Sequence, residues 1–458
     1  MEKNQQLEAK YGLFTAISMV VGQIIGSGIF FKVDDILIAT EGNIFAGLLG
    51  WIIVGLSVVF GAISMANYAE LLPKEGGILS YVEYRFGKKA ASYVGWMYMS
   101  LFYPLLTAVL FTVSGIYIAH LIAEFTNLNP TPLHFMLIGW VNLAMFFVMN
   151  IFSPKSSGIF QQLTTVLKLI PLILISSLAI IAFVGGNVDE THSYVHSAKS
   201  VPANQSLILL VAASFIPIAF AFDGWYIATQ ISGEIKNSKK NLPRALIIGT
   251  SSVLIIYLLY YTGIVYGMGT QEILTLKDTY ITEYSRKLAS NTGALLMQIF
   301  IIISVLGTSN GLLLATIRVP YQFSKLEKSK QFLGLNKINE KTKMPINSAF
   351  LGLISIALYM LLYYFTNTND FFTSKGFDLS AVPIVFIYIV NFGLFIGLLS
   401  LIKKNIFSGN PVLKYIMAII AILGVVVVLV GTATAANGIT YILISLVFFM
   451  IGKLVIKD

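Results

Sequence analysis

Long apolar runs limit the folds open to this chain more than any other feature of its sequence. Twelve stretches are rich in Leu, Ile, Val and Phe and reach the length of about 20 residues that a helix needs to cross a bilayer. They cover residues 11–37, 43–72, 90–123, 132–152, 157–184, 207–233, 242–269, 290–320, 346–365, 379–402, 411–432 and 437–456. Only 11% of the residues are charged, against roughly 25% in soluble proteins, which excludes a soluble enzyme, a disordered chain and a nucleic-acid-binding protein. We expect an all-α membrane protein, one transmembrane domain over residues 1–458, with twelve helices called spans 1 to 12.

Lysine and arginine are distributed unevenly between the two sides of this expected bundle. Most of the 30 Lys and Arg residues fall in segments on the side of the N-terminus, and Lys168 falls inside span 5. The opposite side holds Lys32, Lys199, Lys277, Arg286, Lys287 and Lys375. Because cytoplasmic loops carry the excess of positive charge, we expect both termini in the cytoplasm. The net charge of +9 is then largely explained by the orientation of the helices in the membrane, and it does not indicate a surface that binds nucleic acid.

Spans 1 and 6 are interrupted by glycine near their middles. The interruptions read Val21-Gly22-Gln23-Ile24-Ile25-Gly26-Ser27-Gly28-Ile29-Phe30 and Ala219-Phe220-Ala221-Phe222-Asp223-Gly224-Trp225. Glycine lets a helix unwind, and unwound backbone persists at membrane depth only where it is buried or lines a cavity. Small residues also serve tight helix packing, but a pair of breaks in corresponding positions of two halves indicates a transporter. We expect spans 1–5 (11–184) and spans 6–10 (207–402) to form an inverted repeat, with spans 11 and 12 (411–456) added.

The two breaks would present complementary backbone groups to one ligand. An unwound segment at Gly26–Gly28 frees amide groups at the positive end of the next half-helix, which suits a carboxylate. The preceding half-helix ends in free carbonyl groups near Ile24, and the break around Phe220–Asp223 offers more. Carbonyl groups suit an ammonium group, so the pair of breaks favours a zwitterionic amino acid.

These motifs resemble the amino acid–polyamine–organocation superfamily and, within it, bacterial relatives of the L-type amino acid transporters. The interruptions of spans 1 and 6 carry the resemblance, together with Pro73-Lys74-Glu75-Gly76-Gly77 after span 2 and Asn241-Leu242-Pro243-Arg244-Ala245 before span 7. The resemblance covers essentially the whole chain. It implies a leucine-transporter-like fold that works by alternating access.

The resemblance also implies roles for individual residues. It places the substrate at Ile24, Gly26, Ser27, Gly28, Phe220, Ala221 and Asp223. The carboxylate would meet the amides of Ser27 and Gly28, with Gly26 giving room, and Phe220 would be an aromatic lid. Mammalian relatives bond to a heavy subunit through a cysteine, and this chain has no cysteine, so no disulfide-linked heavy subunit is expected.

Two ionisable residues fall at mid-membrane depth, where such groups are usually functional. Lys168 matches a lysine that, in related transporters, occupies the space of the sodium ion of sodium-coupled members, and would link spans 1 and 8. It could instead carry a proton or simply bond to carbonyl groups. Asp223 could cap an exposed half-helix or recognise a cationic side chain, and the sequence leaves both open.

Three further residues are candidates for gating or coupling. Tyr257 in span 7 resembles a family tyrosine that contacts the cytoplasmic half of span 1 and helps to gate it. Ser309 and Asn310 in span 8 are polar residues at an expected cavity wall, although hydrogen bonding between helices accounts for them equally well.

A membrane enzyme and a channel are the competing classes. The four histidines, His120, His134, His192 and His196, lie in loops or at span ends, away from any catalytic constellation, so we expect no catalytic residue, metal or cofactor. A channel would show a repeated selectivity filter, and none is visible in the sequence.

We therefore expect a sodium-independent transporter in a bacterial cell membrane, in contact with its lipid. By resemblance it would exchange small neutral L-amino acids: alanine, serine, threonine, cysteine and glycine. Two alternatives stay open, namely proton-coupled uptake with Lys168 as the proton site, and exchange that includes cationic amino acids through Asp223.

Overall fold

Helices make up the regular structure of the protein. The computed structural model describes residues 11–26, 28–72, 77–184, 206–226, 229, 235–326, 333–342, 344–407 and 409–456. Within these ranges the only β pairing is an isolated bridge between Tyr11 and Ile235. Ten of the described helices are long and apolar enough to cross a membrane, and two apolar helices are shorter.

Most of the long helices are continuous. They are α4 (Ile44–Leu71), α8 (Pro132–Phe152), α14 (Ser238–Met268), α17 (Ile346–Thr368), α19 (Ala381–Lys403), α20 (Pro411–Thr434) and α21 (Gly438–Val455), whereas α16 (Tyr280–Leu326) contains a bend. Two crossings are composite: α6 (Lys88–Met97) continues through the π-helical turn η1 (Tyr98–Phe102) into α7 (Tyr103–Ala123), and α9 (Pro154–Leu167) continues into α10 (Leu169–Val184). Short helices α5 (Ile78–Phe86), α15 (Thr270–Leu276), η4 (Lys277–Thr279) and α18 (Asp370–Thr373) lie between them.

The short apolar helices stand where the sequence predicts interrupted spans. Span 1 consists of α1 (Leu13–Ile24), α2 (Gly28–Phe31) and α3 (Val33–Ala39), with extended backbone at Ile25. Span 6 begins with α12 (Leu207–Ala213) and α13 (Phe215–Ala221), after which residues 222–226 form turns, with Gly224 at φ 95°. Both predicted interruptions are therefore present. Residues 227–228 and 230–234 of the predicted span 6 lie outside the described residues, as does Ser27.

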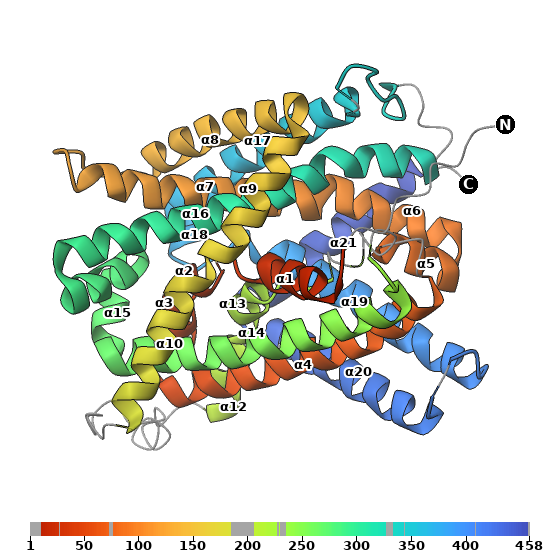
Figure 1. Ribbon diagram of the computed structural model, residues 1–458, viewed down its shortest axis with the longest axis horizontal. Helices are drawn as coiled ribbons and strands as arrows, with labels where there is room; N and C mark the ends of the chain where they lie inside the picture. The colour runs from red at the N-terminus through yellow and green to blue at the C-terminus, as the bar shows by residue number, and fades with distance from the viewer. Residues whose placement is uncertain are drawn as a thin grey trace.

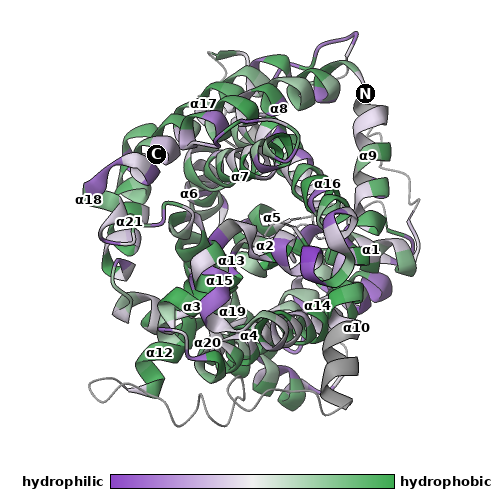
Figure 2. Ribbon diagram, turned by 90° about the vertical axis from the view of Figure 1, so that its left-hand side faces the viewer, coloured by the Kyte–Doolittle hydropathy of each residue, from purple (hydrophilic) through white to green (hydrophobic). Residues whose placement is uncertain are grey.

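The two breaks, at α2 and at the end of α13, lie inside a shell of the long helices (Figure 1). In that shell α4 packs against α14 and α20, α7 packs against α8 and α16, and α1 packs against α14. Figure 2 looks along the bundle and shows hydrophobic residues over most of the surrounding helices and hydrophilic patches near α2, α13 and α15. Outward-facing apolar side chains such as Val141 and Phe152 are 68% and 74% exposed. Such exposure in a soluble protein would be unfavourable, and it suits contact with lipid.

Three irregularities were not predicted from the sequence. Span 5 divides at Lys168, which separates α9 from α10, and span 3 contains the π-helical turn. Span 8 belongs to α16, which begins at Tyr280 and bends at Ala289 and Ser290, where Ser290 has φ 57°. The bend of α16 falls at residue 290, where span 8 was predicted to begin, whereas the π-helical turn at 98–102 lies within an apolar run that predicts ordinary helix.

Candidate functional site

The two interruptions lie directly against each other at the centre of the bundle. A Cβ atom added to Gly28, the first residue of α2, would stand 2.6 Å from the Cα of Ala221, the last residue of α13. Backbone at that distance cannot move aside as a side-chain tip can. Glycine at position 28 is therefore required for the close approach of the two breaks.

Tyr257 of α14 connects the same two breaks. Its hydroxyl group donates to the carbonyl oxygens of Ile24 and Ala221, each at 3.2 Å. The Tyr257 ring packs against Trp51 of α4 and against Phe222, with centroid distances of 5.3 and 5.1 Å. The tyrosine is completely buried, so its position is set by packing, and it holds the C-terminal ends of α1 and α13 at a fixed separation.

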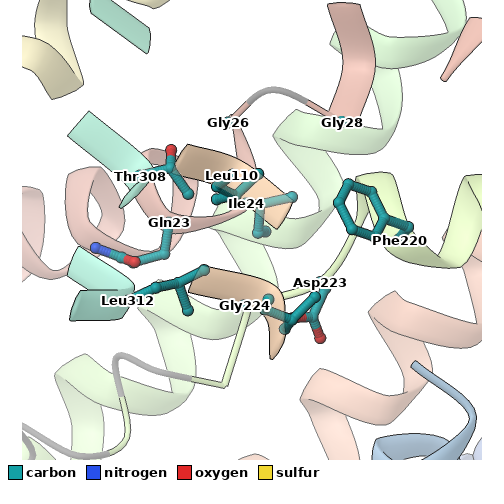
Figure 3. Close-up of a pocket in the computed structure, with 11 residues that line it drawn as sticks. Gln23, Ile24, Gly26, Gly28, Leu110, Phe220, Asp223, Gly224, Thr308 and Leu312 are labelled. Atoms are coloured by element: carbon teal, nitrogen blue, oxygen red, sulfur yellow. The ribbon is translucent and has the colours of Figure 1, made fainter. Parts of the chain in front are cut away.

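A small cavity opens between the breaks and helices α7 and α16; we call it the inner cavity (Figure 3). Its volume is about 40 Å³, and since one water needs roughly 10–15 Å³ on this measure, it leaves room for a few waters. Its lining residues are Gln23, Ile24, Gly26, Gly28, Leu106, Leu110, Phe220, Asp223, Gly224, Thr308 and Leu312.

The backbone on both sides of α2 is held by hydrogen bonds from α16 and α7. Ser304 of α16 donates to the carbonyl oxygen of Gly26 at 3.2 Å. The carbonyl oxygen of Phe30 accepts from the hydroxyl groups of Tyr280 at 3.0 Å and Tyr117 at 3.3 Å. These bonds satisfy backbone acceptors at the break, which would be costly to bury alone.

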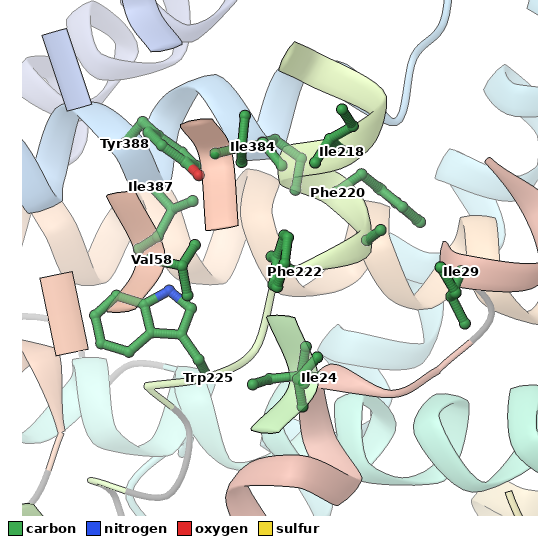
Figure 4. Packing of buried hydrophobic residues seen from close by; sticks show 14 of the residues in the cluster. Ile24, Ile29, Val58, Ile218, Phe220, Phe222, Trp225, Ile384, Ile387 and Tyr388 are labelled. Carbon is green, nitrogen blue, oxygen red and sulfur yellow. The ribbon is translucent and has the colours of Figure 1, made fainter. Parts of the chain in front are cut away.

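The interior of the second break is apolar. Figure 4 shows Phe220, Phe222 and Trp225 among side chains of α4 and α19 that include Val58 and Ile384. All five are buried. This packing fixes the position of the segment that follows α13 without a helical hydrogen-bond ladder.

Lys168 lies at the junction of α9 and α10 and is completely buried. Its ammonium group donates to the carbonyl oxygen of Gly22 on α1 and to the hydroxyl group of Thr308 on α16, the latter at 3.3 Å. These are the two spans that the sequence resemblance named for this lysine. A cation at this point joins the first half of span 1 to span 8.

Asp223 lies in the turn after α13, and its carboxylate accepts a hydrogen bond of 3.0 Å from the hydroxyl group of Tyr226. Asp223 also lines the inner cavity. The half-helix that it was expected to cap falls on residues that the structure does not describe, so the contacts present are a local hydrogen bond and an approach to the cavity.

Ser309 and Asn310 do not line the inner cavity, whereas Thr308 does. Ser309 donates to the carbonyl oxygen of Val305 at 2.8 Å, one turn earlier in α16. The amide of Asn150 on α8 donates to Asn310 at 2.9 Å, and Ser157 on α9 joins the same network. The Asn310 contacts match helix–helix hydrogen bonding, the alternative that the sequence left open for the pair, whereas the Ser309 bond stays within α16.

Cavity residues that the sequence did not single out come from α1, α7 and α16 and from the turn after α13. They are Gln23, Leu106, Leu110, Gly224, Thr308 and Leu312. Leu106 and Leu110 are four residues apart on α7, as are Thr308 and Leu312 on α16, so each pair occupies one helix face. The same spacing occurs throughout a chain of apolar helices, and it could not mark these residues in advance. Among the described residues, no group of three or more His, Cys, Asp or Glu is placed to hold a metal ion.

A bundle of apolar helices with two interrupted helices side by side around a central cavity is the arrangement of a transporter. The chain belongs to the amino acid permease family, whose family model matches residues 11–451. This family is part of the amino acid–polyamine–organocation superfamily and consists of transporters rather than enzymes, which removes the enzyme alternative.

Curated relatives agree with this membership. The chain is 28% identical over 399 residues to the serine/threonine exchanger SteT of Bacillus subtilis, covering 87% of this chain and 84% of the relative. It is 27% identical over 374 residues to the human large neutral amino acids transporter small subunit 2, covering 80% and 68%. The human cystine/glutamate transporter is 26% identical over 344 residues, covering 75% and 66%. The relationship to L-type transporters inferred from the sequence motifs is confirmed.

Proposed function

We propose that this protein is a sodium-independent exchanger of small neutral L-amino acids that works by alternating access. The observation that carries the proposal is the meeting of two helix breaks at Gly28 and Ala221, tied by Tyr257 beside a cavity of about 40 Å³. The coarser statement, amino acid transport, follows from the family and from the relatives.

The backbone at the breaks would bind the two charged groups of the substrate. In this proposal the amide groups of Ser27 and Gly28 receive the carboxylate, with Gly26 leaving room for it. The ammonium group meets the carbonyl oxygens of Ile24, Phe220 and Asp223 at the ends of α1 and α13, near Ala221. The donors to the carboxylate and the acceptors for the ammonium group are then all backbone atoms. Recognition of the zwitterion is therefore independent of the substrate side chain.

Selectivity for small side chains would follow from the space that remains. Phe220 lies at one side of the inner cavity and Thr308 and Leu312 at the other (Figure 3). Leu106 and Leu110 add apolar surface, which favours alanine, serine, threonine, cysteine or glycine over a charged side chain. The name of the Bacillus subtilis relative, a serine/threonine exchanger, supports this substrate class.

The proposal includes a topology and a location. Spans 1–5 and 6–10 form inverted repeats of a leucine-transporter-like fold, over 11–184 and 207–402, with spans 11 and 12 over 411–456. Both termini face the cytoplasm of a bacterial cell, because most Lys and Arg residues lie on that side. With no cysteine in its 458 residues, this chain offers no thiol for a disulfide to a heavy subunit.

Lys168 supports the absence of sodium coupling. Its ammonium group already places a positive charge between Gly22 of α1 and Thr308 of α16. In the proposed mechanism this fixed charge takes the place of a sodium ion. It stays in the protein while one amino acid enters and another leaves.

A trans-stimulation assay tests the proposal. Liposomes with the reconstituted protein are loaded with unlabelled L-serine or left empty, and uptake of labelled L-serine, L-threonine, L-leucine and L-arginine is measured with sodium or choline outside. Exchange predicts uptake of serine and threonine into loaded liposomes only, unchanged by choline. Equal uptake into empty liposomes would refute exchange, and loss of uptake in choline would refute sodium independence.

The cavity position of Asp223 keeps one second candidate open, exchange that includes cationic amino acids. In that case Asp223→Asn would abolish labelled arginine uptake and leave serine exchange intact. If the carboxylate serves only the local hydrogen bond with Tyr226, wild-type liposomes will not take up arginine at all. Proton-coupled uptake through Lys168 would instead appear as uptake into empty liposomes that rises when the outside is acidified.

A further inference from the structure

A cavity at the C-terminal end of α7 shares no lining residue with the inner cavity, and we call it the lateral cavity. Its volume is about 410 Å³, within the range of roughly 300–1,000 Å³ that small-molecule sites occupy. The end of α7 and the start of α16 lie at the same end of the bundle, on the left of Figure 1. The lining residues come from these two helices and from α15 and η4, and they are His120, Ala123, Glu124, Leu276, Thr279, Thr282, Glu283 and Gln298.

The bend of α16 brings distant parts of that helix to the lateral cavity. Glu283 precedes the bend at Ala289 and Ser290, and Gln298 follows it. In a straight helix these two lining residues would be about 22 Å apart along the axis, at 1.5 Å per residue. Because the helix bends, one ligand can contact side chains from both of its arms.

Gln298 has a buried oxygen atom without a partner. The residue is only 2% exposed, and no described residue donates a hydrogen bond to its Oε1 atom. A buried acceptor that is left without a donor is unfavourable. A ligand with an N–H or O–H group would remove that cost, so the lateral cavity favours a hydrogen-bond donor.

The wall of the lateral cavity also carries an excess of negative charge. Glu124 and Glu283 both pair with Arg286, at 2.5 and 3.2 Å, so two carboxylates share one guanidinium group. His120, Ala123 and Glu124 lie at the C-terminal end of α7, which is the negative end of the helix dipole. A ligand that suits this cavity therefore combines a positive charge with hydrogen-bond donors, and an ammonium group has both.

We propose that the lateral cavity binds a primary ammonium group carried on a short aliphatic body. The ammonium group donates to the Oε1 atom of Gln298 and to the carboxylates of Glu124 and Glu283, and the aliphatic part contacts Ala123 and Leu276. No group of three or more metal-binding side chains is found among the described residues, which favours an ammonium group over a metal ion. A soluble alkylamine and the ethanolamine headgroup of a phospholipid both present this group. The site goes beyond the proposed transport function.

A thiol-protection assay tests the site, and because the chain has no cysteine one introduced thiol is the only target. Ala123→Cys places this thiol in the lateral cavity, and its reaction rate with an uncharged thiol reagent is measured in phosphatidylcholine nanodiscs while propylammonium is titrated. At ten times the half-protecting concentration about one eleventh of the cavities stays free, so the rate should fall about elevenfold. Tetramethylammonium, which has the same charge and no N–H group, should give no protection at that concentration.

Gln298→Leu, made in the Ala123→Cys protein, removes the oxygen that has no partner. It should raise the half-protecting concentration about tenfold, which corresponds to about 1.4 kcal/mol. Without amine it should leave the midpoint of thermal unfolding at or above that of the parent, because no hydrogen bond to that oxygen is lost. Gln271→Leu is the matched control, since Gln271 is exposed on α15 and does not line the lateral cavity, and its half-protecting concentration should stay within about twofold of the parent.

Nanodiscs that contain phosphatidylethanolamine identify the carrier of the ammonium group. Slow labelling in them without added amine, made fast again by Gln298→Leu, assigns the site to the lipid headgroup. Fast labelling in them, together with protection by propylammonium, assigns it to a soluble amine. Absence of protection by both sources would overturn the proposal, as would equal protection by tetramethylammonium or an equal effect of Gln271→Leu. Labelling needs no transported substrate, so the trans-stimulation assay tests the proposed function separately.

Discussion

Gly28→Ala is the sharpest test of the site, because its effect follows from one distance. The added Cβ would stand 2.6 Å from the Cα of Ala221, about 1 Å inside the optimum of roughly 3.5–4.0 Å for two carbon atoms. The opposing atom is backbone and cannot rotate away, so the two breaks must separate. Overpacking of this kind costs about 1–3 kcal/mol.

That cost falls on the conformation in which the breaks enclose the inner cavity. An open conformation, with α2 apart from α13, would not bear it. If bound substrate requires the closed arrangement, about 1–3 kcal/mol lowers the affinity by about 5- to 150-fold. The affinity for L-serine can be measured by titration calorimetry on purified protein in nanodiscs, alongside the midpoint of thermal unfolding.

Gly393→Ala is the control. Gly393 lies inside α19, and a Cβ added there meets no atom within 4 Å, so serine affinity should stay within about twofold of wild type, as expected for a distant, independent site. Wild-type affinity in a folded Gly28→Ala protein would refute the reasoning about the close approach. An equal loss in Gly393→Ala would show that the effect is not local.

Three further predictions concern the contacts around the site. Tyr257→Phe removes the hydroxyl group that joins the two breaks. Because a hydrogen bond contributes about 0.5–1.5 kcal/mol, calorimetry should show that serine binds about 2- to 12-fold more weakly. Unchanged binding would contradict the role of Tyr257 in joining the breaks. Lys168→Met removes hydrogen bonds from an ammonium group, worth about 1.5–3 kcal/mol each, and should lower the midpoint of thermal unfolding, whereas an unchanged midpoint would mean that Lys168 holds nothing together. Burial alone would raise the pKa of Asp378, but the ammonium group of Lys32 and the hydrogen bonds from Ser380 outweigh it and hold that pKa below its ordinary value. A lowered acid pKa gives stability that is present above the ordinary aspartate pKa of about 4 and is lost as pH falls through the lowered value. The ion pair of 2.7 Å between Lys32 and Asp378 should therefore contribute equally to the midpoint of thermal unfolding from neutral pH down to about pH 4. Asp378→Asn should lower that midpoint by a similar amount at about pH 7 and at about pH 5, and a difference that vanishes by about pH 5 would contradict the assignment.

The all-helical character and most of the membrane helices were predictable, because hydropathy alone determines which segments enter a membrane. The interruptions were predictable because glycine is a weak helix former and stands near the middle of both spans. The structure breaks span 1 between Ile24 and Gly28 and span 6 after Ala221. The division of span 5 at Lys168 was not predictable, because its neighbours Leu167 and Leu169 are ordinary helix formers. The bend of α16 at Ser290 falls where span 8 was predicted to begin, but the helical segment before it was not predicted.

The site was predictable where the backbone forms it and less so where side chains do. In α16 the sequence pointed to Ser309 and Asn310, whereas Thr308 lines the inner cavity. Successive residues on a helix differ by about 100° in direction, so an error of one residue turns a side chain away from the cavity. Lys32 was assigned only a topological role, because no residue near it in the sequence indicates the distant Asp378.

The hydroxyl group of Tyr257 has one hydrogen atom for two carbonyl oxygens, those of Ile24 and Ala221. The two acceptors therefore share a single proton, and each bond is weaker than an undivided one. An ammonium group arriving at the same place brings three protons. In the proposed function the substrate would supply donors that the protein lacks, and an amino acid whose nitrogen is fully methylated, with no proton to give, should find the same charge complementarity but no place to bond.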